Sequence, residues 1–227
     1  MCGRFLQVAD AQALADFFEA SPSDVDLGAN HNVAPTQEIY GVIASPSGSR
    51  QLRVFEWGLI PAWASDASRR ASLINARAET VRTKPAFSDS FLRRRCLVPM
   101  SGFYEWLPAD ASVTALKQPV LIERVDHDPI AAAGLWSAWR PRDSGDNSAW
   151  HHTCTVITTA SNHTLRAVHD RMPVVLERAE WETWLNPATP ADQLEALLNP
   201  APESSLTFCR VSPEVNSVRN RGPFERL

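Results

Sequence analysis

Short apolar runs separated by turn-forming residues dominate this chain, and they predict many short strands. Short apolar stretches bounded by Gly, Pro, Asn or Ser are typical of strands. Nine segments fit this pattern: Ile39–Ala44, Leu52–Ile60, Cys96–Met100, Ser101–Leu107, Pro119–Glu123, Ile130–Trp139, Cys154–Thr159, Pro173–Leu176 and Leu206–Val211. The stretch Ile130–Trp139 is rich in Ala and Trp, so we expect it to be buried.

Helical periodicity is confined to fewer segments. The clearest is Asp10–Ala20, where Leu14, Phe17 and Phe18 fall on one face and Ser21-Pro22 ends the helix. Shorter helices are predicted at Asp89–Arg94, just after Asn162, at Glu180–Leu185 and at Ala191–Leu198. With 17 Pro residues and many short strands, the pattern predicts an α+β fold. We expect a single compact domain, residues 1–227, with a strongly bent, barrel-like, mostly antiparallel sheet core and peripheral helices.

Composition narrows the class of protein. A chain of 227 residues can bury a substantial core. It contains no apolar run of membrane-spanning length and no visible signal peptide, so we expect a cytoplasmic protein. The cysteines are Cys2, Cys96, Cys154 and Cys209. They are dispersed and form no C-x-x-C pair, which favours reduced thiols over a disulfide framework or a zinc site. The one metal-like grouping, His151, His152 and Cys154, is interpreted as a strand edge, and the polar segment Asp143–Ser148 as a surface loop. We expect no metal and no cofactor.

Charge is unevenly distributed. The formal net charge is −4, but the segment from Arg69 to Arg95 contains eight basic residues and only two acidic ones, Glu79 and Asp89. Such a stripe suits a polyanion such as DNA. The alternative for the Arg93–Arg95 run is a solvated helix end.

The N-terminus offers unusual chemistry. If Met1 is removed, Cys2 carries an α-amine and a thiol on adjacent carbons. Such a 1,2-aminothiol condenses with an aldehyde to an imine, which the thiol closes to a thiazolidine. The ordinary pKa values of both groups lie close enough to neutrality for modest local shifts to deprotonate either one. A Cys at this position is otherwise a frayed or buried small residue.

Two further residues could transfer protons. Glu105 shares a strand face with Phe103 and Leu107, where a charged carboxylate is costly, and this suits a general acid or base. The alternative is a wet sheet edge. His169 lies between a loop and a strand in His169-Asp170-Arg171, although a lone His is often structural.

Taken in order, six motifs resemble the SRAP family (SOS response-associated peptidases, also called abasic site processing proteins, with YedK-like and HMCES-like members). They run nearly end to end: Met1-Cys2-Gly3-Arg4-Phe5, Asn32-Val33-Ala34-Pro35, Trp57-Gly58-Leu59-Ile60-Pro61, Asn75-Ala76-Arg77-Ala78-Glu79-Thr80, Gly102-Phe103-Tyr104-Glu105-Trp106 and His169-Asp170-Arg171-Met172-Pro173.

The resemblance implies a set of site residues. It implies four catalytic residues, Cys2, Asn75, Glu105 and His169, and six DNA-binding residues, Arg4, Pro35, Trp57, Arg77, Thr158 and Arg171. The implied activity is a covalent crosslink to abasic sites in single-stranded DNA in the DNA damage response, through the Cys2 amine and thiol. Self-cleavage of Met1, or its removal by an aminopeptidase, and weak lyase activity accompany it.

The expected partner is single-stranded DNA containing abasic sites, bound by a monomer that is nucleoid-associated when on DNA. Trp57 or Trp63 with Pro35 would stack on bases, and the arginines would follow phosphates. The alternatives are an N-terminal-nucleophile amidohydrolase, in which the Cys2 thiol attacks an amide, and a non-catalytic single-strand-binding module.

Overall fold

A computed structural model describes residues 2–108, 117–141 and 149–227. The predicted loop Asp143–Ser148 lies outside these ranges, as does Met1. In the part of the chain that is described, no helix is long and apolar enough to cross a membrane.

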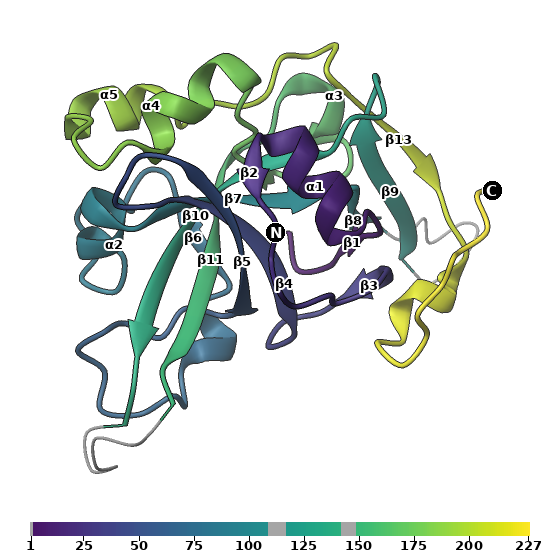
Figure 1. Ribbon diagram of the computed structural model, residues 1–227. Coiled ribbons are helices and arrows are strands. Elements are labelled where there is room, and N and C mark those ends of the chain that lie inside the picture. Colours follow the sequence, from purple (N-terminus) through teal and green to yellow (C-terminus); the bar gives the residue numbers. More distant parts are fainter. Residues whose placement is uncertain (1, 109–116, 142–148) are drawn as a thin grey trace.

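Five strands close into a barrel (Figure 1). They are paired in the order β11 (His151–Ala160), β10 (Ile130–Trp139), β7 (Arg95–Met100), β4 (Glu38–Ala44) and β5 (Arg50–Trp57). These four pairings are antiparallel. A short parallel pairing of β5 with β11, Glu56 opposite Thr153 and Trp57 opposite Cys154, completes the ring. The predicted bent, mostly antiparallel core is confirmed.

A second sheet carries the N-terminal segment. Its order is β13 (Leu206–Arg210), β9 (Gln118–Arg124), β8 (Gly102–Leu107), β1 (Phe5–Gln7) and β3 (Asn30–Val33). Three short strands extend the barrel sheet: β2 (Ala20–Ser21) pairs with β5, while β6 (Asn75–Arg77) and β12 (Arg171–Pro173) both pair with β11. Because β1 lies between β8 and β3, the residues before it are held in the interior.

In Figure 1, α4 and α5 lie at the upper edge of the molecule and α2 at its left edge, while α1 lies in front of the strands. The longest, α1 (Ala11–Phe18), begins where the Asp10 side chain accepts from Ala13 N–H and ends at Glu19, which has a left-handed φ of 53°. The others are short: α2 (Ser88–Arg93), α3 (His163–Arg166), α4 (Trp181–Leu185), α5 (Ala191–Ala196) and the 3-10 turns Arg70–Ser72, Arg178–Glu180 and Pro213–Asn216. Each predicted helix is therefore present, with bounds shifted by a few residues.

Strand alternation divides the core in two. Inward-facing residues such as Phe55, Trp57, Cys96 and Val156 pack in one buried cluster that also includes Cys2. Outward-facing residues pack in a second cluster, where Leu14 and Phe18 of α1 join Trp181 and Trp184 of α4. Helices α1, α2, α4 and α5 therefore cover the outer surface of the barrel, and its interior side chains pack with Cys2 and residues of the second sheet.

Two predicted strands differ from the observed ones. Leu52–Ile60 stops at Trp57, because Gly58 has a φ of 139° that turns the chain away. The predicted strand Pro173–Leu176 is instead Arg171–Pro173. Beyond Pro173 the chain crosses to β10, since Val174 N–H donates to Ile157 but Leu176 N–H donates to Ala131.

Candidate active site

Cys2 is fully buried at the centre of the fold. Its side chain has 0% exposure and belongs to the same apolar cluster as Phe5, Trp57 and Phe103. Burial, and secondarily the negative charge of Glu105, raise the pKa of the Cys2 thiol well above its usual range. The expectation that this thiol is close to ionising at neutral pH is therefore wrong for the folded chain. A neighbouring base must remove its proton during a reaction.

Asn75 holds the backbone of Cys2. Its Nδ2 donates to the Cys2 carbonyl oxygen at 2.7 Å, while its Oδ1 is buried with no hydrogen-bond partner in the described part of the chain. An acceptor left in this state is costly unless a bound molecule satisfies it. Asn75 lies here because β6 pairs in parallel with β11, Asn75 opposite Val156.

The strand that carries Asn75 presents a cation on the same face. Ala76 is buried, so alternation puts Asn75 and Arg77 together on the opposite face, about 6–7 Å apart along the strand. Arg77 is exposed. A phosphate beside the Asn75 side chain would therefore meet a guanidinium.

Glu105 lies next to Cys2 on the neighbouring strand. β8 pairs with β1 so that Phe103 is opposite Phe5, and Tyr104 N–H donates to the Arg4 carbonyl. Continuing this register places Glu105 across from Gly3, one residue from Cys2. The Glu105 side chain is 5% exposed, and its charge acts on the Cys2 thiol. The expectation of a wet sheet edge is therefore wrong, and a carboxylate stands beside the buried thiol.

His169 is held by its own backbone context. Its N–H donates to the Leu165 carbonyl of α3, and Asp170 C=O accepts from Ser161 N–H at the end of β11. The His169 Nδ1 accepts the Arg171 backbone N–H at 2.9 Å and also lies 2.8 Å from a carboxylate oxygen of the exposed Asp170. The two contacts require different states of Nδ1, because the Arg171 N–H needs a lone pair there and the Asp170 carboxylate needs a hydrogen.

Arg171 ties together the strands around the site. It binds both carboxylate oxygens of Glu79, at 2.8 and 3.0 Å, and donates to the Thr158 carbonyl at 2.6 Å. Glu79 follows β6, Thr158 lies on β11 and Arg171 begins β12. This bidentate contact lowers the pKa of Glu79 and keeps it ionised. Arg171 thus braces the strand that positions Asn75.

The arrangement brings Cys2, Asn75 and Glu105 together, and His169 comes just before β12 in the barrel sheet, which also contains the Asn75 strand. The sequence profile of the family described as SOS response associated peptidase (SRAP) matches residues 1–218. The chain belongs to the SRAP family. This confirms the resemblance carried by the six sequence motifs.

Relatives from several kingdoms match this SRAP chain along most of its length. "Abasic site processing protein YoqW" of Bacillus subtilis is 36% identical over 226 residues, covering 98% of this chain and 97% of the relative. "Abasic site processing protein YedK" of Escherichia coli is 28% identical, with 98% and 97% covered. "Abasic site processing protein HMCES" of Xenopus tropicalis is 30% identical over 78% of this chain and 57% of the relative. A crystal structure of a Bacteroides thetaiotaomicron protein has a TM-score of 0.84 at 28% identity, covering 94% of this chain and 93% of that one.

Two predicted DNA contacts of this SRAP chain are buried in the folded state. Trp57 is 0% exposed, stacks edge-on against Phe5 and donates to the Ile74 carbonyl. Thr158 is also 0% exposed, on a strand flanked on both sides. Both residues support the site from the core. Pro35 is half-buried in a turn next to Trp57, where Thr36 N–H donates to the Trp57 carbonyl.

One terminal nitrogen of the Arg4 guanidinium is held by hydrogen bonds within the protein. Its Nη1 donates to Asn32 Oδ1 at 2.7 Å and to the Val215 carbonyl at 2.9 Å, and burial lowers its pKa. The buried Asn32 in turn donates to the carbonyls of Ser217 and Asn220. Asn32 therefore holds the Arg4 side chain in place and also binds the C-terminal segment through Ser217 and Asn220. Its place in the Asn32-Val33-Ala34-Pro35 motif was the only sequence signal for this role.

The Arg93–Arg95 run does not form one basic stripe. Arg95 is 3% exposed and donates to the carbonyls of Trp184, Phe91 and Asn186, all at 2.6 to 2.7 Å. Arg93 and Arg94 both pair with Asp89 on the surface. For Arg95 the prediction of a phosphate contact is wrong, because its guanidinium fastens α4 to the barrel.

A cavity of about 620 Å³ opens near the start of β6. Leu73, two residues before Asn75, lines it, together with the basic side chains of Arg69, Arg70 and Lys84. Trp63, which is 58% exposed, stands at its wall. Of the two tryptophans considered for base stacking, Trp63 is the one with an accessible ring.

Proposed function

We propose that this protein processes abasic sites by covalent capture in single-stranded DNA, through the α-amine and thiol of Cys2 after removal of Met1. The observation that carries the proposal is the buried Cys2, with Asn75 bound to its carbonyl and the Glu105 charge beside its thiol. Family membership supports it, since relatives over almost the whole chain are named abasic site processing proteins.

The first step joins the amine to the sugar. An abasic deoxyribose equilibrates with its ring-opened aldehyde, and the uncharged Cys2 amine adds to the aldehyde carbon to form a carbinolamine. Loss of one water gives the imine. His169 is the imidazole suited to donate a proton to the ring oxygen as the sugar opens. The buried Oδ1 of Asn75 offers an acceptor to a sugar hydroxyl or to the amine.

The second step closes the thiazolidine. The thiol sulfur forms a bond to the imine carbon, and the thiol proton ends on the nitrogen. Because burial raises the pKa of the Cys2 thiol, this step needs a base, and the Glu105 carboxylate is the charged group beside it. Glu105 accepts the thiol proton and returns it to the nitrogen, so no cofactor is required.

The DNA path follows the accessible cations. Arg77 lies beside Asn75, and Arg69, Lys84 and Trp63 line the nearby cavity. Phosphates would contact the cations and a base would stack on Trp63, which gives sequence-tolerant, salt-sensitive binding. Arg4 and Arg171 contribute mainly by holding Asn32 and Glu79 in place.

Two side reactions belong to the same proposal. An imine that persists before thiol closure allows β-elimination, which is a weak lyase activity. Met1 is removed either by the protein itself or by an aminopeptidase, and the protein works as a monomer in the cytoplasm.

A gel and mass spectrometry assay tests the proposal. The mature protein is incubated with single-stranded DNA containing one abasic site, alongside Cys2→Ser and a variant that retains Met1. The proposal expects a denaturant-stable adduct for the mature chain and none for either variant without chemical reduction. If Cys2→Ser gives an equally stable adduct, the thiazolidine is wrong. If small amides are turned over without an adduct, the chain is an N-terminal-nucleophile hydrolase.

A further inference from the structure

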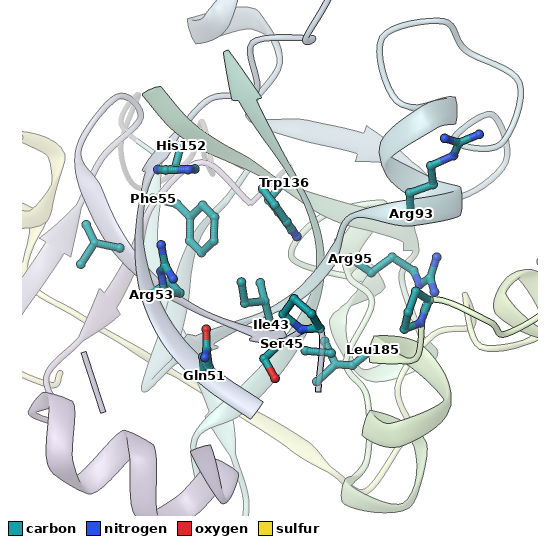
Figure 2. A pocket seen from close by; sticks show the side chains of 14 residues that line it. Ile43, Ser45, Gln51, Arg53, Phe55, Arg93, Arg95, Trp136, His152 and Leu185 are labelled. Atoms are coloured by element: carbon teal, nitrogen blue, oxygen red, sulfur yellow. The ribbon is translucent and has the colours of Figure 1, made fainter. Parts of the chain in front are cut away.

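One mouth of the barrel contains a cavity that the capture reaction does not use. It has a volume of about 340 Å³, within the range of small-ligand sites, and barrel mouths are a common place for them. Figure 2 shows inward-facing side chains around it, with Arg53 and Phe55 of β5 on one side and Trp136 of β10 on the other. The end of α4 closes its rim through Leu185.

Three aromatic rings form one wall. The centre of the Phe55 ring lies 6.0 Å from that of Trp136 and 6.5 Å from that of His152, and the last two rings are 6.4 Å apart. Phe55 is buried with its ring over Gly41, where an added Cβ would lie 2.9 Å from the ring. Trp136 is half-buried and His152 exposed, so both offer surface to a planar ligand.

The charge of the cavity is positive. Its charged lining residues in the described part of the chain are Arg53, Arg93 and Arg95, with no carboxylate among them. Arg95 is saturated by backbone carbonyls, and Arg93 has a loose contact with Asp89 at 3.6 Å. The Arg53 side chain lines the cavity and makes no hydrogen bond or ion pair within the described residues. A guanidinium in this position is available to an anion.

His152 suits stacking rather than charge pairing. Partial desolvation of the exposed ring and the neighbouring charge of Arg53 lower the pKa of His152, which favours the neutral form of the ring. In its neutral form the ring leaves the anion to Arg53.

The barrel interior separates this cavity from Cys2. Below Phe55 it is filled by Cys96, Cys154 and Val156, and Gly134 approaches Cys96 so closely that an added Cβ would lie 2.8 Å from its sulfur. A ligand at the mouth would therefore be bound independently of the capture chemistry.

We propose that the barrel mouth is a nucleotide-binding site, in which Trp136 and His152 contact the base over Phe55 and Arg53 binds the phosphate. A base can contact the accessible rings of Trp136 and His152, which are inclined by 55° to each other, and a phosphate supplies the anion that Arg53 lacks. The nucleotide is either a free mononucleotide or the phosphorylated end of a DNA strand.

Calorimetric titration of the full-length protein tests the site. The ligands are dAMP, deoxyadenosine and a short unmodified oligonucleotide with a 5′-phosphate. The variants are Arg53→Gln, Trp136→Leu and the control Arg210→Gln, which removes the same charge from the exposed part of β13. We expect Arg53→Gln to weaken dAMP binding tenfold or more without changing deoxyadenosine binding. Trp136→Leu should weaken both, and Arg210→Gln neither.

The ligand arms and the capture assay separate the outcomes. If the oligonucleotide competes with dAMP and loses affinity in Arg53→Gln, the site takes a strand end; if only dAMP binds, it takes a free nucleotide. No binding of dAMP at millimolar concentration, or equal effects of Arg53→Gln and Arg210→Gln, would overturn the proposal. Arg53 is exposed, so Arg53→Gln should fold normally and retain the wild-type rate of abasic-site capture.

Discussion

Asn75 gives the sharpest test of how the fold prepares Cys2. Its Nδ2 donates to the Cys2 carbonyl at 2.7 Å, and its second polar atom is buried without a partner among the described residues. Asn75→Ala leaves the carbonyl without its donor and the sugar without its acceptor. A lost hydrogen bond at a buried group costs about 1–3 kcal/mol. At 1.4 kcal/mol per factor of ten, the crosslinking rate should fall about fivefold to 140-fold.

The assay must separate chemistry from binding. Single-turnover crosslinking is measured at saturating abasic single-stranded DNA, and affinity is measured on an oligonucleotide with an unreactive tetrahydrofuran in place of the abasic sugar. Asn75→Ala should lower the saturated rate and leave affinity within about twofold, which is under 0.5 kcal/mol.

Arg77→Gln is the matched control for Asn75→Ala. Arg77 shares the strand face with Asn75 but is exposed. Its replacement should weaken affinity and reduce the salt dependence of binding by about one phosphate contact, with the saturated rate unchanged. A wild-type rate for Asn75→Ala, or an equal loss of saturated rate in Arg77→Gln, would refute the positioning role.

Four further outcomes follow from the structure. Glu105→Gln should slow adduct formation at saturating DNA by about 10²-fold or more, the usual scale of general-base catalysis; equal losses of rate and affinity would make Glu105 structural. Burial raises the pKa of the Cys2, Cys96 and Cys154 thiols. Unfolding therefore releases protons above about pH 8.5, and the free energy of unfolding should fall by up to about 1.4 kcal/mol per pH unit for each thiol. In urea unfolding between about pH 8 and 10, this free energy should fall less steeply with pH in Cys154→Ala than in the wild type, and an equal dependence on pH would contradict the burial argument. Arg95→Met removes the donor from three carbonyls, two of them in buried hydrogen bonds, and should cost about 3 kcal/mol or more in thermal unfolding. By contrast, Arg93→Met should cost under about 0.5 kcal/mol. Trp63→Ala should weaken single-strand binding by about 1–3 kcal/mol in a fluorescence titration, and an unchanged affinity would remove it from the DNA path.

Local patterns in the sequence were sufficient for most of the fold. Asp10 and the spacing of Leu14, Phe17 and Phe18 define α1, because capping and amphipathicity are properties of neighbouring residues. The long buried strand β10 can likewise be predicted from its apolar run. Alternation around Glu105 correctly separates Phe103 and Leu107, which pack in the barrel cluster, from Tyr104 and Trp106, which pack in a separate cluster on the other face of β8.

Elements defined by distant pairing could not be predicted. β6 has three residues, two of them polar, and exists because β11 supplies its partners. The barrel closes through two residue pairs between β5 and β11, which leave no periodic signal. The same limit applies to Trp57. Its place at the end of a strand suggested a rim, but closure of the barrel turned that side chain into the interior.

Charge runs were the least reliable guide to the candidate site. Arg93, Arg94 and Arg95 are adjacent in sequence, yet the turn from α2 into β7 leaves two at the surface and buries the third under α4. Conversely, Arg53 belongs to no basic run and faces a cavity with no ion-pair partner among the described residues. The direction of a side chain, which depends on register, decides whether its charge meets solvent, a backbone carbonyl or a ligand.

The most direct test of the central claim is to locate the crosslink. The mature protein is reacted with abasic single-stranded DNA, digested, and analysed by peptide mass spectrometry. We predict that the nucleotide remnant lies on the peptide beginning at Cys2, with the loss of one water, a blocked α-amine and a thiol that no longer reacts with alkylating reagents. A remnant on any lysine, or on Cys2 with its thiol still free to alkylate, would contradict the thiazolidine and the role given to Cys2.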